Sequence, residues 1–343
     1  MRAVVYSETG GPDVLTVVER KIPEPGPGEV RVRIVFSGVN PTDWKSRSGS
    51  STRGGGLAAD EVVPNQDGSG VVDAVGPGVE GLAAGDRVWT YLSAYQRPTG
   101  TAQEYTVLPS ERVVKLPASA SFELGASLGV PAMTAHRALT VAEGGPSRLG
   151  PGALAGRTVL VAGGAGAVGH AAIQLARWAG ATVITTISGP EKATLATNAG
   201  AHHVVNYKEQ DAAAEIQKIA PDGVHQVVEV SPSRNAALNQ AVLANHGLVA
   251  VYATDGGSEM TLNVGGHFAT NVRYQFLLLY TVGQPALDAA AEDITRAIED
   301  GVLPVGEEHG LPILRYPLER TGDAHVAVEN GAVGKVLIEV GAP

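Results

Sequence analysis

The chain has 343 residues, a formal net charge of −10 and no cysteine. Hydrophobic residues make up 44% and charged residues 17%, a balance typical of folded proteins large enough for two cores. These values exclude disulfides and thiolate chemistry. They also argue against a nucleic-acid or anionic-membrane surface, because either would need clustered basic residues.

The first third of the chain is predicted to be rich in short β-strands. Alternating or β-branched runs are separated by Gly and Pro turns, which is typical of a small barrel-like domain. The expected strands are 3–6, 15–19, 29–39, 70–75, 87–90 and 102–107. A Ser- and Gly-rich stretch is expected to form a mobile loop at 46–59. No basic and apolar leader precedes the first strand and no apolar run is long enough to span a bilayer, so we expect a soluble, cytoplasmic protein.

The middle of the chain begins with helices expected at 122–129 and 133–142 and then alternates between strands and helices. Strands are expected at 158–162, 182–187, 203–206, 226–230 and 248–252, and helices at 168–178, 191–198, 212–219 and 236–243. Such alternation predicts a doubly wound parallel sheet, a Rossmann domain. A helix at 287–300 and a strand at 336–340 are expected to return to the first domain. We therefore predict a β-rich domain formed by 1–129 and 283–343, and a nucleotide domain formed by 130–282.

A glycine-rich turn follows the first strand of the alternating region. Gly164, Gly166 and Gly169 form the spacing G-x-G-x-x-G between a strand and a helix. We expect Gly164 to allow the tight turn, Gly166 to let the backbone approach a pyrophosphate, and Gly169 to let the helix pack closely. Free N–H groups at the helix start would bind phosphate oxygens. The predicted dinucleotide contacts are Gly164, Ala165, Gly166, Ala167, Val168 and Gly169; the alternative is a Gly-rich turn in a sheet that binds another ligand.

The end of the second strand of this region bears on the choice of dinucleotide. An NAD site usually carries an acidic residue there, about 20 residues after the glycines. This chain has Ser188 followed by Gly189, and Lys192 comes within one helical turn. A hydroxyl and a cation suit the 2′-phosphate of NADPH, which is the predicted cofactor. Alternatively, Lys192 is a solvated residue at the start of a helix.

Several short motifs follow one another along the chain, namely Gly38-Val39-Asn40-Pro41-Thr42-Asp43, Gly85-Asp86-Arg87-Val88, 163–169, Gly200-Ala201, Asn206-Tyr207 and Gly331-Ala332-Val333-Gly334-Lys335. The order of these motifs and of the two domains resembles the medium-chain dehydrogenase/reductase superfamily, most closely its quinone oxidoreductase (zeta-crystallin-like) branch. The resemblance covers almost the whole chain. It implies that the first domain is a GroES-like partial barrel with the catalytic residues. It also implies a homodimer paired through an edge strand near 274–280.

The zinc ligands of the superfamily's alcohol dehydrogenases are missing from this chain. Those enzymes have a Cys near Asn40, a His near Gln66 and another Cys near Gly129. This chain has no Cys, and no two of its nine His are spaced by three or four residues. We therefore expect no bound metal.

The resemblance implies further contacts with the cofactor. Asn40 and Thr134 would lie near the nicotinamide and its ribose, and Tyr207 near the adenosine phosphate. The other implied contacts lie at strand ends or on the nicotinamide side, namely Val230, Ser231, Tyr252, Ala253, Thr254, Tyr274, Gln275, Phe276 and Lys335. For each of these residues, ordinary packing or capping is the alternative.

Three neighbouring residues, Asn40, Asp43 and Lys45, are the candidate catalytic groups. Hydride transfer needs little from the protein beyond orientation. Without zinc, conjugated acceptors are favoured over simple alcohols because they delocalise the arriving charge, and a hydrogen-bond donor then suffices. Quinone oxidoreductases often have Tyr where this chain has Lys45, which would stabilise an enolate or semiquinone oxygen or donate a proton. Alternatively, Lys45 pairs with Asp43 and has a structural role.

The predicted function is NADPH-dependent reduction of a quinone or an α,β-unsaturated carbonyl compound. One alternative is an enoyl reductase acting on an acyl thioester, with Arg47 and Arg53 facing a pantetheine phosphate. Another is a structural or sensor protein that binds NADPH with little turnover. His136 is expected to be a packed or surface residue rather than a catalytic one.

Overall fold

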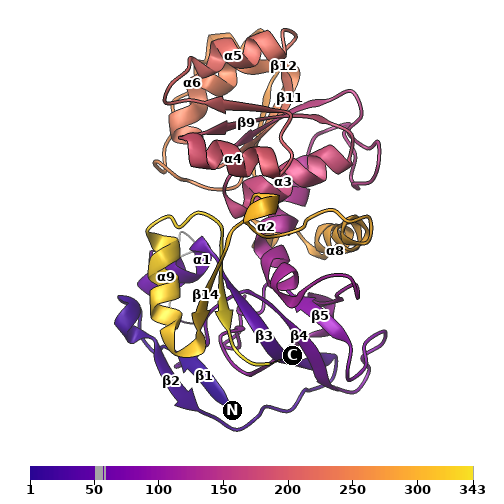
Figure 1. Ribbon diagram of the computed structural model, residues 1–343, viewed down its shortest axis with the longest axis vertical. Helices are drawn as coiled ribbons and strands as arrows, with labels where there is room; N and C mark the ends of the chain where they lie inside the picture. Colours follow the sequence, from indigo (N-terminus) through magenta and orange to yellow (C-terminus); the bar gives the residue numbers. More distant parts are fainter. Residues whose placement is uncertain (51–56, 58, 343) are drawn as a thin grey trace. The chain divides into compact units, whose positions relative to one another are not determined.

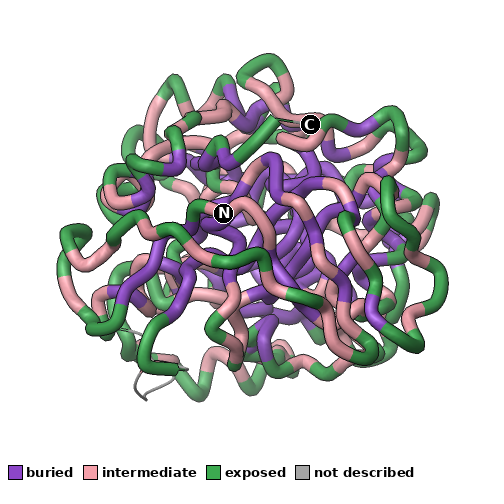
Figure 2. The backbone as a smooth tube through the Cα atoms, turned by 90° about the horizontal axis from the view of Figure 1, so that it is seen from below, coloured by how far each residue is buried: buried purple, intermediate pink, exposed green. Residues whose placement is uncertain are grey.

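A computed structural model of the chain describes residues 1–50, 57 and 59–342. Contacts within it divide the chain into two compact units, Met1–Val130 with Ile313–Pro343, and Pro131–Pro312. Of the loop expected at 46–59, residues 51–56 and 58 lie outside the described residues, and 46–48 belong to a helix. Figure 2 shows buried backbone toward the centre of the picture and exposed turns at its rim.

The first unit is built on a mixed seven-stranded sheet in the order β14-β15-β3-β4-β5-β7, with β6 also paired to β3 (Figure 1). The eleven-residue β3 organises this sheet, because it pairs along its length with β4 and with β6 and β15 at its two ends. The strands of the unit are β1 (Arg2–Val5), β2 (Thr16–Glu19), β3 (Glu29–Val39), β4 (Asp67–Val75), β5 (Arg87–Thr90), β6 (Tyr105–Pro109), β7 (Val113–Lys115), β14 (Ile313–Pro317) and β15 (Lys335–Glu339). The predicted β-rich first part is confirmed, and the last strand returns to it as expected.

Two helices of the first unit were not expected from the sequence. They are α1 (Pro41–Ser48) and α9 (Thr321–Glu329), which pack against each other. The buried face of α1 is formed by Asp43 and Arg47, which lie one turn apart. Because these residues are charged, the helix shows no apolar period that would reveal it.

The second unit contains a six-stranded, fully parallel sheet in the order β10-β9-β8-β11-β12-β13. Numbered within the unit this is 3-2-1-4-5-6, the doubly wound order of Rossmann folds, so the predicted fold class is confirmed. Helices α3 and α4 cover one face, and α5 and α6 cover the other (Figure 1). The elements are β8 (Thr158–Ala162), α3 (Ala167–Trp178), β9 (Thr182–Ile187), α4 (Pro190–Asn198), β10 (His203–Asn206), α5 (Ala212–Ile219), β11 (Val224–Glu229), α6 (Pro232–Val242), β12 (Leu243–Val251), α7 (Val264–Phe268) and β13 (Arg273–Phe276).

Two expected boundaries are wrong. The helices expected at 122–129 and 133–142 form one continuous helix, α2 (Phe122–Thr140), with Pro131 inside it. The edge strand expected near 274–280 ends at Phe276, and a 3₁₀ turn follows at Leu279–Thr281. Apolar composition alone does not distinguish these conformations in so short a run.

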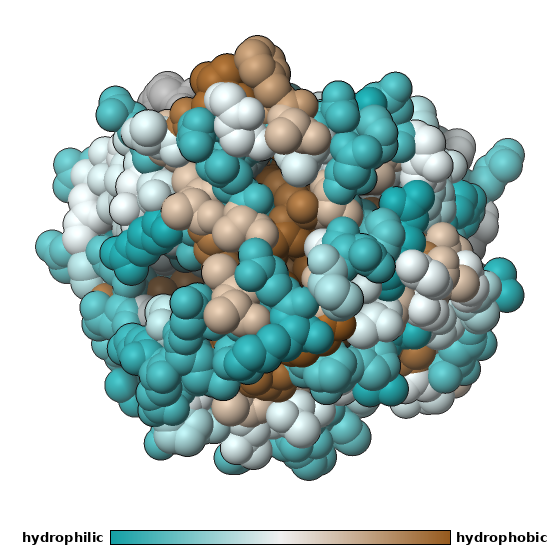
Figure 3. All heavy atoms as spheres, turned by 90° about the horizontal axis from the view of Figure 1, so that it is seen from above, coloured by the Kyte–Doolittle hydropathy of each residue, from teal (hydrophilic) through white to brown (hydrophobic). Residues whose placement is uncertain are grey.

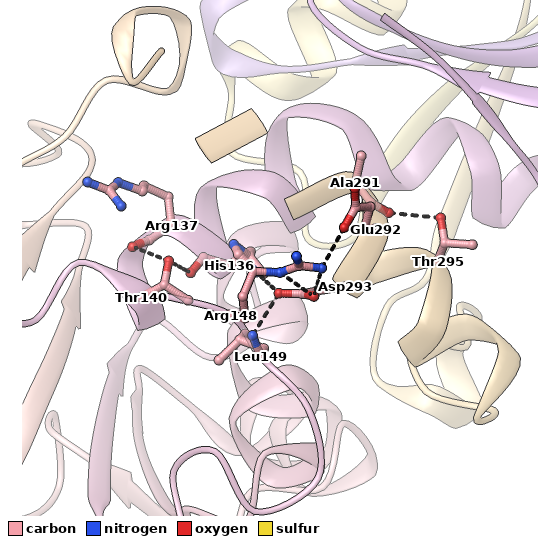
Figure 4. A network of polar contacts seen from close by, with 9 residues as sticks. All are labelled: His136, Arg137, Thr140, Arg148, Leu149, Ala291, Glu292, Asp293 and Thr295. Carbon is pink, nitrogen blue, oxygen red and sulfur yellow. Dashed lines mark hydrogen bonds and ion pairs between the residues drawn. The ribbon is translucent and has the colours of Figure 1, made fainter. Parts of the chain in front are cut away.

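Helix α8 (Gln284–Glu299) belongs to the second unit, not to the first domain as expected. Its Asp293 carboxylate lies 2.8 Å from His136 Nε2 and accepts hydrogen bonds from Leu149 N (2.7 Å) and Arg148 Nη2 (2.6 Å). Figure 4 shows this network, which joins α8 to α2 and to the segment that precedes β8. These contacts are polar and join residues about 150 positions apart in the chain. The periodicity of apolar residues therefore could not predict where α8 packs. His136 is packed within this network.

No helix in the described part of the chain is both long and apolar enough to cross a membrane.

Candidate functional site

The β8–α3 turn has the geometry that its glycines predict, with one change of role. The left-handed residue is Gly163 (φ +73°), so Gly163 and not Gly164 makes the tight turn. A Cβ on Gly164 would lie 2.2 Å from Thr185 Oγ1, so Gly164 is needed for packing on β9. A Cβ on Gly169 would lie 2.3 Å from the Gly163 carbonyl oxygen, which agrees with its expected role in close packing.

Gly166 leaves space at the start of α3. A Cβ there would make only an ordinary contact, 3.5 Å from the Gly163 carbonyl oxygen. Gly166 is the N-cap residue, and no described side chain caps the helix. The N–H groups of the first turn therefore remain for an anion, as a pyrophosphate site requires.

The corner after β9 brings together the residues expected to contact the adenosine phosphate. Ser188 and Gly189 connect β9 to α4, and Lys192 lies in the first turn of α4. Tyr207 follows β10, is 52% exposed, and donates its N–H to the Ile187 carbonyl oxygen (3.1 Å). In the described residues no carboxylate pairs with Lys192, so this corner presents a hydroxyl and a cation.

The turns after β11 and β12 are tied together by hydrogen bonds. Tyr252 N–H donates to the Glu229 carbonyl oxygen, and Asp255 N–H donates to that of Val230, both at 3.1 Å. Ser231 Oγ donates to the Asp255 carbonyl oxygen (2.5 Å). The expected contacts Val230, Ser231, Tyr252, Ala253 and Thr254 thus lie together at the carboxyl end of the sheet, where ligands of doubly wound folds bind.

Glu229 is a buried residue of this region that the sequence did not reveal. Its carboxylate accepts hydrogen bonds from Ser231 N (2.6 Å), Asn235 Nδ2 (2.9 Å) and Asn239 Nδ2 (2.7 Å). These bonds fix the β11–α6 turn. The only signal in the sequence is an acidic residue inside an apolar run, and the two asparagines one helical turn apart become its partners only once α6 has formed.

The residues of the second unit that were expected on the nicotinamide side differ in how far they are buried. Tyr274 is half-buried and packs against the apolar core of the second unit, and its hydroxyl lies 3.0 Å from His267 Nε2. Gln275 and Phe276 are exposed. Thr134 is buried within α2. Strand alternation separates Tyr274 from Gln275, because successive side chains point to opposite faces.

A buried polar cluster lies where β3 leads into α1 in the first unit. Asn40 Nδ2 donates to Asp67 Oδ2 (2.6 Å), and Asn40 Oδ1 accepts from Lys335 Nζ (2.8 Å). Lys335 Nζ also lies 3.2 Å from the Val39 carbonyl oxygen and 3.6 Å from Asp67 Oδ2. Asn40 N–H donates to Asp43 Oδ2 (2.7 Å). Asn40 and Asp43, two of the predicted catalytic residues, are therefore held in the interior.

The electrostatics of this cluster follow from its burial. Desolvation penalises the charged form of each group, so the pKa values of Asp43 and Asp67 rise and that of Lys335 falls. The pKa of Asp43 rises to about 8, because burial and the neighbouring Asp67 carboxylate both disfavour its ionised form. The opposite charges of Lys335 and Asp67 counteract the desolvation of both.

Lys45 lies on a different face of α1 from Asp43. Residues two positions apart on a helix do not face each other, and the Lys45 ammonium lies over the Trp44 ring, 5.6 Å from its centre. The alternative in which Lys45 pairs with Asp43 is therefore wrong. Arg47 does not face outward either, because its side chain is buried and its Nη2 lies 3.0 Å from Glu329. Arg53 lies outside the described residues.

The buried cluster does not fit a zinc ion. No group of three or more His, Cys, Asp or Glu in the described residues is arranged to hold a metal. The Lys335 ammonium already lies between Asn40 and Asp67, and a second cation would be repelled by it. The segments around Asn40, Gln66 and Gly129 instead meet through the Asp67 carboxylate, which accepts from Asn40 Nδ2 and from Val130 N–H (2.9 Å).

Comparisons with known proteins agree with this architecture. Residues 26–118 match the family model of the alcohol dehydrogenase GroES-like domain, and residues 167–296 match that of zinc-binding dehydrogenases. The chain is 30% identical to the quinone oxidoreductase of Lama guanicoe, over 98% of this chain and 97% of that protein. It is also 30% identical to the 2-haloacrylate reductase of a Burkholderia species, over 95% and 94%.

Two solved structures resemble nearly the whole chain. An NAD-dependent alcohol dehydrogenase has a TM-score of 0.84 at 31% identity and covers 99% of this chain and 100% of its own. Mycobacterial Rv1454c, solved in complex with NADPH, has a TM-score of 0.81 at 30% identity and covers 99% of both chains. With a GroES-like unit, a Rossmann unit and near-complete coverage by these relatives, the chain belongs to the quinone oxidoreductase (zeta-crystallin-like) family of medium-chain dehydrogenases/reductases and is an oxidoreductase.

Proposed function

We propose that this protein is an NADPH-dependent reductase of quinones or α,β-unsaturated carbonyl compounds that works without zinc. The observation that carries the proposal is the buried cluster around Lys335. An ammonium with a full set of partners lies among the segments that would otherwise be joined by a metal. Without a metal to polarise the acceptor, such a reductase would act on compounds that are already electrophilic.

The bound cofactor would supply the hydride, and the chain would supply orientation and charge stabilisation. A conjugated acceptor delocalises the arriving negative charge onto its oxygen. The Lys45 ammonium, which faces away from the buried cluster, is proposed to donate a hydrogen bond or a proton to that oxygen. Asn40 and Asp43 are proposed to hold the start of α1 in place rather than to exchange protons with the substrate.

The comparisons support a conjugated acceptor, because one relative is named a quinone oxidoreductase and another a 2-haloacrylate reductase. The corner formed by Ser188, Lys192 and Tyr207 supports NADPH, and so does the NADPH complex of one structural neighbour. The other neighbour is an NAD-dependent alcohol dehydrogenase, so both cofactors belong in the test.

The function is tested by following NADPH and NADH oxidation with quinones, enals, enones and enoyl thioesters. We expect quinones or enones to be reduced with NADPH and enoyl thioesters to be poor acceptors. Lys45→Met should lower kcat at least tenfold and leave NADPH affinity within about twofold. Lys21→Met, which removes an exposed lysine of the same unit, serves as the control and should not change turnover.

Three results would contradict the proposal. Steady oxidation with enoyl thioesters alone would favour a biosynthetic enoyl reductase. Tight NADPH binding with no turnover on any acceptor would favour a sensor. Unchanged turnover of Lys45→Met would remove Lys45 from the reaction and leave the rest of the proposal intact.

A further inference from the structure

We propose that Lys335 is a positioning residue for the reduction, whose buried ammonium fixes the Asn40 amide and through it the first turn of α1. This inference rests on the proposed function, because it concerns how the acceptor-facing helix is held. Lys335 begins β15, almost 300 residues after Asn40 in the chain, and its side chain is 1% exposed.

Lys335 and Asp67 together join four segments of the first unit, including β15, which begins at Lys335. The ammonium contacts the end of β3 at the Val39 carbonyl oxygen (3.2 Å) and at Asn40 Oδ1 (2.8 Å). The Asp67 carboxylate at the start of β4 accepts from Asn40 Nδ2 (2.6 Å) and from Val130 N–H in α2 (2.9 Å). The end of β3, the start of β4 and α2 are therefore held by one cation and one anion.

Two glycines leave the space that these charged groups occupy. A Cβ on Gly38 would lie 3.2 Å from Lys335 Nζ and 2.3 Å from the Ala126 carbonyl oxygen. A Cβ on Gly129 would lie 2.1 Å from Asp67 Oδ1. Any side chain at 38 or 129 would push backbone or charged atoms apart. The cluster is thus built into the backbone of three elements.

The Asn40 amide can satisfy this arrangement in one orientation only. Its oxygen accepts from the ammonium and its nitrogen donates to Asp67, while its backbone N–H donates to Asp43 Oδ2 in the first turn of α1 (2.7 Å). Loss of the ammonium would remove a charged donor from Asn40 Oδ1 and weaken the preference for this orientation. Lys45 lies one turn after Pro41, the first residue of α1, so the position of its ammonium depends on where α1 begins.

A positioning role and a purely stabilising role predict different behaviour. Removing one member of a buried ion pair leaves an unpaired charge and is strongly destabilising, whereas replacing both with neutral groups is often neutral for stability. If Lys335 only stabilises the fold, a neutral pair should restore activity together with stability. If it positions α1, the neutral pair should restore stability alone.

The experiment compares Lys335→Met with the double variant Lys335→Met/Asp67→Asn. We expect the single variant to lose much of its thermal stability, and the double variant to regain most of it. The double variant should still have kcat reduced at least tenfold, with KM for NADPH within about threefold. The matched control is Arg47→Met/Glu329→Gln, which neutralises another buried cation of α1 and should keep kcat within about threefold.

Recovery of kcat in the stable double variant would overturn the proposal, and so would an equal loss of kcat in the control. Hydrogen exchange provides a readout that does not depend on activity. Amides of 39–48 should exchange faster in the double variant, and those of β8 and α3 should not change. If the wild-type protein reduces none of the acceptors, the proposed function fails, and the exchange result still decides whether Lys335 positions α1.

Discussion

Asp43 is a buried carboxyl group beside a second one, Asp67, in the interior of the first unit. Burial and this neighbour raise its pKa from 3.8 to about 8. In the unfolded chain the same group titrates near 3.9. Between these values the folded protein binds more protons than the unfolded chain, so this group makes the free energy of unfolding decrease as pH rises. Its stabilising contribution is complete below pH 4 and is lost above about pH 8.

We expect Asp43→Asn to remove this dependence, because an amide oxygen can still accept from Asn40 N–H but does not titrate. As pH rises from 5 to 8, the free energy of unfolding of the wild type should fall relative to that of the variant by up to about 1.4 kcal/mol per pH unit. Urea denaturation at several pH values measures it. Asp73→Asn, which changes a more exposed carboxylate of β4, is the control, and a parallel pair of curves for wild type and Asp43→Asn would contradict the prediction.

Lys192 is the residue on which the choice of cofactor depends. It lies in the first turn of α4, after a strand that ends without an acidic residue. We expect Lys192→Gln to raise KM for NADPH at least fivefold and to leave KM for NADH within about twofold, because only NADPH carries the 2′-phosphate. Steady-state kinetics with both cofactors measure this. Lys208→Gln is a control in the neighbouring β10–α5 turn. An equal effect on both cofactors would assign Lys192 to the fold rather than to the phosphate.

Individual residues show where sequence information is sufficient. The spacing of Gly164, Gly166 and Gly169 predicted the nucleotide turn, because those residues act within one strand and one helix. The role of Gly163 needed backbone angles, since four glycines in seven positions give no indication of which one is left-handed. The Lys335 cluster combines residues from positions 40, 67 and 335, and nothing local marks them as partners.

At the level of elements, most strands and helices of the second unit were predicted, because apolar β-branched strands alternate with helices and Gly or Pro turns separate them. Helix α7, which has five residues, was missed. Helix α1 was missed because its buried residues are charged, and its polar partners lie elsewhere in the chain. Helix α8 was predicted as a helix but assigned to the wrong domain. The apolar face of α8 predicts that the helix packs against a core. The contacts of Asp293 with His136 and Leu149 show that its partners are α2 and the segment before β8.

Asp293 is the residue through which α8 is held. Contacts with His136, Arg148 and Leu149 N–H lower the pKa of its carboxyl group to about 2, although burial opposes this. The contribution of this group to stability is therefore present above about pH 4 and is lost as pH falls toward 2. We expect Asp293→Asn to reduce the free energy of unfolding at pH 7 by about 2–4 kcal/mol, because the Arg148 and His136 partners lose their anion.

Hydrogen exchange and denaturation check this prediction together. Amides of α8 should exchange faster in Asp293→Asn, and those of the first unit should be unaffected. Glu292→Gln is the control, because this neighbouring carboxylate is exposed and, among the residues that the structure describes, pairs with Arg148 alone. Equal destabilisation by both variants would contradict the role assigned to Asp293.

For the whole molecule, the open edge of the parallel sheet bears on assembly. Strand β13 pairs with β12 on one side, and no described strand pairs with its other side. Its end carries Phe276, which is 60% exposed, and nearby in the chain Phe268 is 78% exposed. Figure 3 shows the face of the molecule on which hydrophobic residues reach the surface among hydrophilic ones. Exposed apolar residues beside an unpaired edge favour pairing with another chain.

We propose that a second copy of this chain pairs at β13, which would extend both sheets across a two-fold axis. A two-fold axis repeats each edge residue in both copies, so a charge introduced at the edge would be desolvated twice on association. We therefore expect Phe276→Asp to convert the protein from a dimer to a monomer, as measured by sedimentation or light scattering. Val17→Asp, at an exposed apolar position on β2, should leave the mass unchanged. A monomeric wild-type protein at micromolar concentration, or a dimeric Phe276→Asp variant, would show that β13 is not the interface.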